Sequence, residues 1–315
     1  MYIEHFCLSL KPFQINTDQR FLYLSEKHQE ALAMLRYGIL NNRGVLVLTG
    51  DVGTGKTILI RTLVENLGPE IRTAVISDPG LRGLDFFKFM AHAIGMETDF
   101  NTKGEFLICF SNFLDSLFAA NQEALLILDE AQYIDPIQLE EIRIFSDLER
   151  ENNKRLNIFF VGQNEFNLML MDTRLRALKQ RISSHYHLEP LSLKETSDYV
   201  QHRLKVAGCD RPLFIPSALE EIFEITNGYP RLINILCDLC LLSAFVKDLY
   251  EIDPAIVKES AAELMHPNQL NEQYVGPSKN KPISAHTSDA EIQRPLAPEN
   301  IRVEPTTMSA IKTTA

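Results

Sequence analysis

The chain has 315 residues, of which 45% are hydrophobic and 23% charged, and its formal net charge is −11. This composition is ordinary for a globular protein and excludes a chain without a hydrophobic core. The most apolar run, residues 232–246, is shorter than the roughly 18–20 residues of a membrane helix and contains Asn234 and Asp238. Because Glu4 stands near the N-terminus and no basic region precedes an apolar one, no signal peptide is predicted and a cytoplasmic location is expected.

The charge is concentrated in one part of the chain. Residues 266–315 contain five basic and five acidic side chains, so residues 1–265 carry the whole net charge of −11. An acidic body matches a nucleic-acid backbone poorly, which disfavours nucleic acid as a partner without excluding a local basic face. Residues 266–315 also contain six of the 15 prolines and one aromatic residue, Tyr274. Such a segment buries too little apolar surface to offset the entropy of ordering, and a disordered polar tail is predicted.

The cysteines are odd in number and follow no signal peptide, so reduced thiols are expected. They are Cys7, Cys109, Cys209, Cys237 and Cys240. The last two form a CxxC pattern inside an apolar helical segment, without a second ligand pair that would complete a zinc site. We therefore interpret them as core thiols.

Short apolar runs alternate with longer amphipathic ones in residues 1–190. Continuous apolar runs such as residues 45–49 are typical of strands buried on both faces. The alternation predicts a three-layer α/β domain with a parallel sheet. The predicted strands are Val45–Thr49, Thr73–Ser77, Leu125–Leu128, Ile158–Gly162 and His185–Leu188. The predicted helices are Lys56–Asn66, Leu84–Ile94, Gly104–Asn121, Pro136–Asn152 and Thr173–Arg181.

No strand pattern follows Pro190, and residues 191–265 are predicted to form a small all-helical domain. Ser192 with Glu195, and Ser217 with Glu220, have the spacing of capping boxes. Gly208 and Gly228 stand where a helix end favours a left-handed glycine. The predicted helices are Lys194–Ala207, Ala218–Asn227, Arg231–Lys247 and Pro254–Met265.

Residues 50–57, GDVGTGKT, match the phosphate-binding pattern G-x-x-x-x-G-K-[ST]. The motif directly follows a predicted strand and opens a predicted helix, which is the setting that this chemistry needs. Its glycines let backbone N–H groups surround the phosphates, and the helix N-terminus adds a partial positive charge. Lys56 would contact the β and γ phosphates, and the Thr57 hydroxyl would bind Mg²⁺.

A buried strand that ends in Asp129 and Glu130 supplies the acidic partners of this loop. Asp129 would hold hydrated Mg²⁺, and Glu130 would polarise the attacking water. Alternatively, these acids cap the following helix. A polar residue after the next strand would reach between the acids and the γ-phosphate; Gln163 is the first candidate and Asn164 the second, while a plain polar loop remains an alternative.

Phosphoryl transfer also needs cations, and an arginine supplied by a neighbouring subunit can contribute about 10³–10⁵ in rate. The candidates Arg174, Arg176 and Arg181 lie on one predicted helix, where solvated surface charges are the alternative. Arg231 is a fourth candidate, because Pro230 suits the first turn of a helix and fixes where that arginine stands. It would place a cation from the helical domain near the nucleotide.

Together these residues resemble the ExeA-like, or general secretion pathway protein A, family of AAA+ ATPases over about residues 1–265. The N-terminal matches are Leu10–Phe13, Arg20–Ser25, His28, Glu30–Leu32, Tyr37 and Gly38. The nucleotide-site matches are Leu48–Thr57 for Walker A, Leu128–Gln132 for Walker B and Val161–Gln163 for sensor 1. The remaining matches are Gln180–Ile182 around the arginine finger, His202–Leu204, and Gly228–Asn234 with Arg231 as sensor 2.

The resemblance implies a P-loop NTPase fold of the AAA+ and ASCE type, with the P-loop strand central and a C-terminal helical lid. It implies ATP and Mg²⁺ as cofactors, ring or filament homo-oligomers, and an N-terminal segment, Pro12–Tyr23, that wraps the adenine. The chain then divides into a P-loop ATPase α/β domain (1–190), a helical lid domain (191–265) and the disordered polar tail (266–315). The expected catalytic residues are Lys56, Glu130, Gln163, Arg181 and Arg231. The expected nucleotide-binding residues are Gly50, Asp51, Val52, Gly53, Thr54, Gly55, Lys56, Thr57, Ile58, Asp129 and Arg231, with Thr57 and Asp129 binding the metal.

Three functions follow from the resemblance as hypotheses. The first is an ATPase that drives assembly or remodelling of an envelope-associated secretion, pilus or exopolysaccharide complex. The second is a DNA-dependent helper ATPase of a transposition-type system, and the third is a nucleotide-binding switch with low turnover. Many secretion relatives continue into a transmembrane helix and a peptidoglycan-binding domain, whereas here a polar tail follows Met265. We therefore expect no direct membrane insertion, and recruitment to the inner membrane face by a protein partner.

Overall fold

The computed structural model describes residues 1–15, 18–77, 80–146 and 156–264. The predicted tail, residues 266–315, lies outside these ranges, so its disorder stays a prediction. Within the described ranges no helix is both long and apolar enough to cross a membrane.

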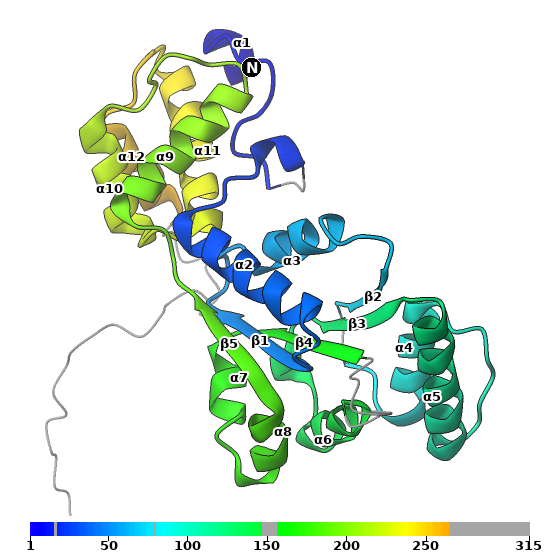
Figure 1. Cartoon of the computed structure of the whole chain (residues 1–315). Coiled ribbons are helices and arrows are strands. Elements are labelled where there is room, and N and C mark those ends of the chain that lie inside the picture. Colours follow the sequence, from blue (N-terminus) through cyan, green and yellow to red (C-terminus); the bar gives the residue numbers. More distant parts are fainter. Residues whose placement is uncertain (16–17, 78–79, 147–155, 265–315) are drawn as a thin grey trace, which may run out of the picture. The chain divides into compact units, whose positions relative to one another are not determined.

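Five parallel strands form one sheet in the order β2-β3-β4-β1-β5 (Figure 1). The strands are β1 (Val45–Gly50), β2 (Ile71–Ile76), β3 (Glu123–Leu128), β4 (Leu156–Gly162) and β5 (Ile182–Leu188). All five predicted strands are present, and the α/β fold class is confirmed. The strand that leads into residues 50–57 is internal, between β4 and β5, but the middle strand of the sheet is β4.

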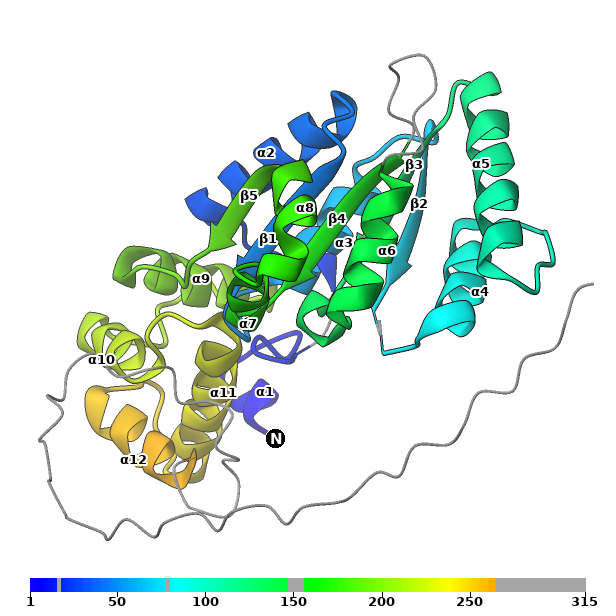
Figure 2. The ribbon, with the colours of Figure 1, turned by 90° about the horizontal axis from the view of Figure 1, so that it is seen from below.

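Helices cover both faces of the sheet (Figure 2). Successive side chains of a strand point to opposite faces, so Leu46 and Leu48 of β1 pack on one side while Val45 and Val47 pack on the other. The first face carries α2 (Glu26–Leu40) and α3 (Lys56–Glu65). The second face carries α4 (Gly83–Ile94), α5 (Lys103–Ala119), α6 (Pro136–Phe145), α7 (Asn164–Met169) and α8 (Arg176–Arg181). This double burial explains why β1, β3 and β4 are almost continuously apolar, whereas β2 and β5 at the sheet edges also carry polar residues.

The C-terminal described region contains α9 (Leu193–Val206), α10 (Pro216–Thr226), α11 (Pro230–Val246) and α12 (Pro254–Leu264). Ser192 and Glu195 form the predicted capping box at the start of α9. The box predicted at Ser217 is wrong: Pro216 takes the first helical position and Ile215 is the N-cap, because proline has a helical φ and no N–H to lose. Gly208 and Gly228 have φ values of 91° and 75°, as predicted.

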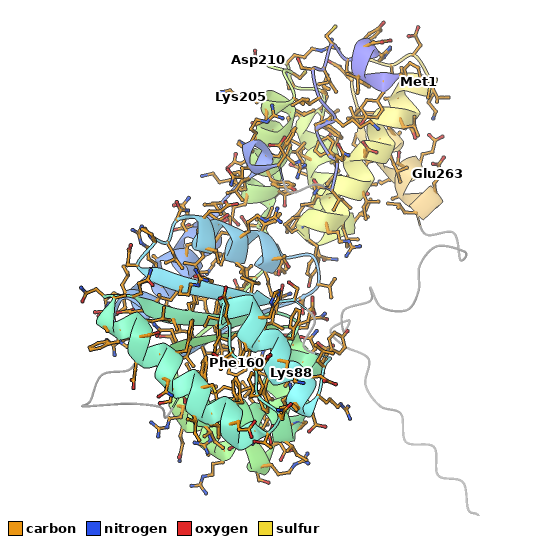
Figure 3. The ribbon with its side chains drawn as sticks, turned by 90° about the vertical axis from the view of Figure 1, so that its right-hand side faces the viewer. Met1, Lys88, Phe160, Lys205, Asp210 and Glu263 are labelled. Carbon is orange, nitrogen blue, oxygen red and sulfur yellow. The ribbon has the colours of Figure 1, made fainter. Side chains whose placement is uncertain are left out.

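The core of this helical region also contains the N-terminus of the chain. Phe6, Phe13 and Phe21 are almost fully buried in one hydrophobic cluster with residues of α9 and α11. The Tyr2 hydroxyl of α1 (Tyr2–His5) donates a hydrogen bond to Asp238 of α11. In Figure 3, Met1 lies on the same helical region as Lys205, Asp210 and Glu263, whereas Phe160 lies in the sheet. The first residues therefore pack with the helices, although the boundaries predicted from the sequence placed them in the first domain.

Two helices of the α/β region were not predicted from the sequence. The helix α2 begins at the N-cap Ser25 and buries Ala31, Leu35 and Ile39, which are spaced four residues apart. The second, α7, has only six residues. The helix predicted for residues 136–152 ends at Phe145, and residues 147–155 lie outside the described ranges.

The five cysteines are free, and Cys237 and Cys240 are fully buried on α11. Burial, as the first cause, raises the pKa of both thiols, and that of Cys240 to about 12. No group of three or more metal-binding side chains occurs in the part of the chain that the structure describes. The interpretation of both cysteines as core thiols is confirmed.

The packing of the N-terminus predicts that it stabilises the helical region. Replacing Phe6, which is 0% exposed, with alanine should lower the free energy of unfolding by about 3–5 kcal/mol, because a cavity forms where the ring packed. Urea denaturation followed by circular dichroism measures this loss. The control is Ile15→Ala: its side chain is 63% exposed and should change stability by less than about 0.5 kcal/mol. Equal effects of the two substitutions would contradict the assignment.

Candidate functional site

Residues 50–57 form a loop between β1 and α3, and two of its glycines have backbone conformations that other residues rarely adopt. Gly53 has φ 85° and Gly55 has φ 102°. The Lys56 ammonium is 2.8 Å from the Gly50 carbonyl oxygen and 2.9 Å from that of Asp51, and donates to both. The loop thus folds around its own lysine, as a loop that cradles phosphate does.

Lys56 is a buried cation among acids. Burial is the largest influence and lowers its pKa, while Glu130, Asp129, Asp51 and Glu165 act in the opposite direction. The two loop carbonyls satisfy two of the three ammonium donors. Such a group would gain strongly from an anion beside it, since a phosphate brings both charge and acceptors.

The sheet topology brings the acids that follow β3 to the same edge as the loop. Asp129 accepts a hydrogen bond from the Thr57 hydroxyl at 3.4 Å. The Asp129 carboxylate is buried, which is the main reason that its pKa is raised. A carboxylate next to a hydroxyl is a set of hard oxygen ligands that suits Mg²⁺, and a bound cation would favour the ionised form of Asp129. Both residues predicted to bind the metal are therefore adjacent.

Glu130 stands beside Asp129 in a left-handed conformation, with φ 54°. One of its carboxylate oxygens accepts hydrogen bonds from the side-chain amides of Gln132 and Gln163, at 2.5 and 3.0 Å. The Gln132 amide oxygen in turn accepts from the Gln163 backbone N–H at 3.0 Å. Of the two candidates after β4, Gln163 reaches Glu130. The sequence interpretation did not select Gln132, although its position two residues after Glu130 was a usable signal.

Asp51 connects the loop to two other parts of the site. It accepts a hydrogen bond from the Asn164 side chain at the start of α7 and one from the Tyr229 hydroxyl at 2.6 Å. Burial and this hydrogen bond to a carboxylate raise the pKa of Tyr229 to about 12. Asn164, the second candidate after β4, thus contacts the loop rather than Glu130.

The start of α11 lies directly on the phosphate-binding loop. The Arg231 backbone N–H donates to the Gly53 carbonyl oxygen at 3.4 Å, and a Cβ on Gly53 would lie 2.9 Å from the Cβ of Arg231. Glycine is therefore needed at position 53 for the close approach as well as for its φ. The backbone of Arg231 thus lies beside the loop, while a contact of its guanidinium with nucleotide stays a prediction.

Of the three arginines that precede β5, Arg181 lies far from the loop of its own chain. Arg181 directly precedes β5, whose first residue pairs with Val45, while Leu188 at the other end pairs with Gly50. A strand of this length places Arg181 about 20 Å from the loop. Arg174 forms an exposed ion pair with Asp172, and Arg176 begins α8. A single chain therefore does not bring Arg181 to its own phosphate-binding loop.

A pocket lies beside α3, next to the phosphate-binding loop. Its walls come from the N-terminal segment, α3 and α9: Asp18, Gln19, Phe21, Leu22, Thr57, Ile58, Arg61, Thr62, Glu65 and Arg203. Its lining combines the apolar side chains of Phe21, Leu22 and Ile58 with seven polar or charged residues. It lies against the second half of the Pro12–Tyr23 segment that the resemblance assigned to adenine.

Arg203 fixes that N-terminal segment on the helical region. It is 5% exposed and donates to the Pro12 carbonyl at 2.5 Å, the Gln14 carbonyl at 2.9 Å and the Tyr199 hydroxyl at 2.8 Å. Its guanidinium also lies over the Phe21 ring, 5.0 Å from the centroid. These carbonyls and rings satisfy the buried cation and attach Pro12, Gln14 and Phe21 to α9.

Comparisons with known proteins agree with this geometry. Residues 39–170 match a family model described as an AAA domain. The chain is 38% identical over 266 residues to general secretion pathway protein A of Aeromonas hydrophila, an alignment that covers 84% of this chain. The aligned part is 48% of that protein, so the chain spans about half the length of this relative.

Two solved structures share the fold. The ORC2 protein of Aeropyrum pernix, in ADPNP–ADP complexes, is 18% identical with a TM-score of 0.57, over 78% of this chain and 71% of that chain. Cdc6p of Pyrobaculum aerophilum is 20% identical with a TM-score of 0.61, over 78% and 70% of the two chains. The predicted AAA+ P-loop fold and the resemblance to general secretion pathway protein A are confirmed.

The Tyr229–Asp51 hydrogen bond predicts that Tyr229→Phe loosens the helical region from the loop. Amide hydrogen exchange of Leu191, whose N–H donates to the Gly228 carbonyl at 2.9 Å, should become about tenfold faster, because a hydrogen bond to a carboxylate contributes about 1.5–3 kcal/mol. Tyr250→Phe, at an exposed tyrosine stacked on His5, is the matched control and should leave this exchange unchanged. Unchanged exchange in Tyr229→Phe would show that the contact does not hold the two parts together.

Proposed function

We propose that the chain binds and hydrolyses Mg-ATP, and that hydrolysis serves the assembly or remodelling of an envelope-associated secretion complex. The observation that carries the catalytic part is the convergence of Lys56, Thr57, Asp129 and Glu130 at one edge of the sheet. The similarity to general secretion pathway protein A supports the second part.

In this proposal, each chemical requirement of ATP hydrolysis is met by a named residue. Lys56 and the loop amides of residues 50–57 bind the β and γ phosphates, and Thr57 with Asp129 holds Mg²⁺, which neutralises phosphate charge when bound. Glu130 orients and deprotonates the attacking water through the carboxylate oxygen that the amides of Gln132 and Gln163 leave open. The pocket between the N-terminal segment and α3 receives the nucleoside.

The remaining cations act on the transferred phosphoryl group in this proposal. Arg231 contacts the nucleotide from the helical region of the same chain, because α11 begins on the loop. Arg181 contacts the nucleotide of a neighbouring copy, since it lies at the far end of β5. A site that needs Arg181 from a neighbour is complete only in an oligomer, which is why we propose a ring or filament as the active form.

The hydrolysis proposal predicts that Glu130→Gln retains Mg-ATP binding and loses at least about 100-fold in phosphate release, because the base that activates water is missing. Lys56→Ala should abolish tight binding. The matched control is Glu123→Gln, at the opposite end of β3, which should leave both binding and turnover near the wild-type values. Equally negligible phosphate release from wild type and Glu130→Gln would favour a nucleotide-binding switch.

The neighbour arginine is tested by comparing Arg181→Ala with Arg174→Ala and Arg176→Ala. Arg181→Ala should lower turnover of the oligomer by about 10³-fold or more and leave nucleotide binding nearly unchanged, while the other two have small effects. Mixing Arg181→Ala with Lys56→Ala subunits should restore part of the activity, since the second variant supplies the arginine. If mixing restores nothing, Arg181 does not act across the subunit boundary.

The proposed partner class is tested with the Glu130→Gln variant held in its ATP-bound form. Affinity capture from cells of the source organism should enrich proteins of a membrane secretion system over the Lys56→Ala variant. DNA-stimulated hydrolysis together with salt-sensitive DNA binding, without such proteins, would instead support a helper ATPase that acts on DNA.

A further inference from the structure

A buried histidine outside the phosphate-binding motif contacts that loop from α2. His28 is 5% exposed and lies in the first turn of α2, after the N-cap Ser25, which is 2% exposed. Its Nε2 atom is 3.0 Å from the Thr54 carbonyl oxygen, and its Nδ1 atom is 2.6 Å from the Ser25 hydroxyl. The imidazole therefore bridges the start of α2 and the loop.

The partners of His28 define its protonation. A carbonyl oxygen only accepts, so Nε2 must carry a hydrogen and donate to Thr54. The Ser25 hydroxyl oxygen already accepts from the His28 backbone N–H at 3.3 Å, and its own hydrogen can be donated to Nδ1. These contacts fit the neutral imidazole with its hydrogen on Nε2. Burial, the first cause, also lowers the pKa of His28, against smaller opposing effects of Thr54 and Glu195.

The hydrogen bond to Thr54 fixes the direction of a loop amide. In a planar trans peptide the carbonyl and the following N–H point in opposite directions. Because the Thr54 carbonyl points to His28, the Gly55 N–H points away from His28. It lies directly before Lys56, among the amides at the start of α3 that would face phosphate.

The fit between the imidazole and the loop is close. A Cβ on Gly55 would lie 2.9 Å from the His28 Nε2 atom, nearer than side chains normally approach. Gly55 thus gives the loop its left-handed turn and also leaves room for the histidine. A bulkier residue at position 55 would displace the group that orients the peptide.

The same turn of α2 is joined to the start of the helical region. The Glu195 carboxylate accepts from the Ser192 backbone N–H and hydroxyl, and lies beside the Glu26 backbone N–H. Burial would raise the pKa of Glu195, but these hydrogen bonds together lower it. Lys27 also forms an exposed ion pair with Glu189. The first turn of α2 therefore contacts both the loop and residues 189–195, which lead into the helical region.

We propose that His28 is a positioning residue for the phosphate-binding loop: its neutral imidazole, oriented by Ser25, turns the Thr54–Gly55 peptide so that the Gly55 N–H faces the phosphates. The role rests on the proposed nucleotide binding but not on hydrolysis. Nucleotide affinity then depends on a side chain that does not contact the nucleotide. Because the start of α2 contacts both the loop and residues 189–195, a movement of these residues would change the conformation of the loop.

The test compares His28→Gln, His28→Ala and Leu35→Ala in the full chain. The Gln Nε2 amide can replace the histidine donor, so His28→Gln should keep ADP and ATP affinity within about threefold, whereas His28→Ala should weaken it about tenfold. Leu35 is fully buried on the same helix, about two turns beyond His28, so Leu35→Ala controls for a loss of α2 stability. Binding is measured by calorimetry at a temperature where all variants are folded.

Amide hydrogen exchange of residues 54–57 in the nucleotide-free protein gives a second reading that does not depend on the proposed function. His28→Ala should speed exchange there by about tenfold, and His28→Gln should not. Wild-type affinity and exchange in folded His28→Ala, or equal losses in Leu35→Ala, would overturn the positioning role. If the wild-type chain binds no nucleotide, the proposed function fails, and the exchange comparison alone decides about His28.

Discussion

The loop of residues 50–57 must present several backbone N–H groups to one point, and most of the contacts around the site enforce that constraint. Lys56 draws the carbonyls of Gly50 and Asp51 to one side, and His28 draws the carbonyl of Thr54 to another. Each contact orients a peptide plane, which leaves its N–H directed elsewhere. The conformation of the loop thus depends on elements that lie far apart in the sequence. Nucleotide affinity is therefore expected to depend on the stability of each of these elements.

Charge imposes the second requirement on this site. Three carboxylates act on the buried ammonium of Lys56 more strongly than any other acid, namely Glu130, Asp129 and Asp51. A polyphosphate that enters beside them would meet repulsion unless cations compensate. Mg²⁺ on Thr57 and Asp129, with Arg231 and a neighbour's Arg181, would supply that compensation. A net charge of −11 is therefore compatible with binding an anion, because local cations rather than the total charge decide it.

The path of the chain connects the helical region to the α/β region. The N-terminal segment packs in the helical core and is held there by Arg203, yet it also lines the pocket next to α3. The chain passes between the helical core and the sheet twice, near residues 22–25 and 189–192. A nucleoside in that pocket would contact residues of both parts at once.

The sequence by itself determined the strands, most helices, the phosphate motif and the acids, because short apolar runs between amphipathic segments indicate strands and a glycine-rich loop before a helix has few other uses. It could not show that His28 contacts the loop, since its partner Thr54 comes from another element. The sequence also placed Phe6 and Phe13 in the first domain, whereas they pack in the helical core. The apolar character of a residue does not show which core buries it. Only the tertiary structure decided that Arg181 lies about 20 Å from its own loop, since strand register, not spacing along the chain, sets that distance.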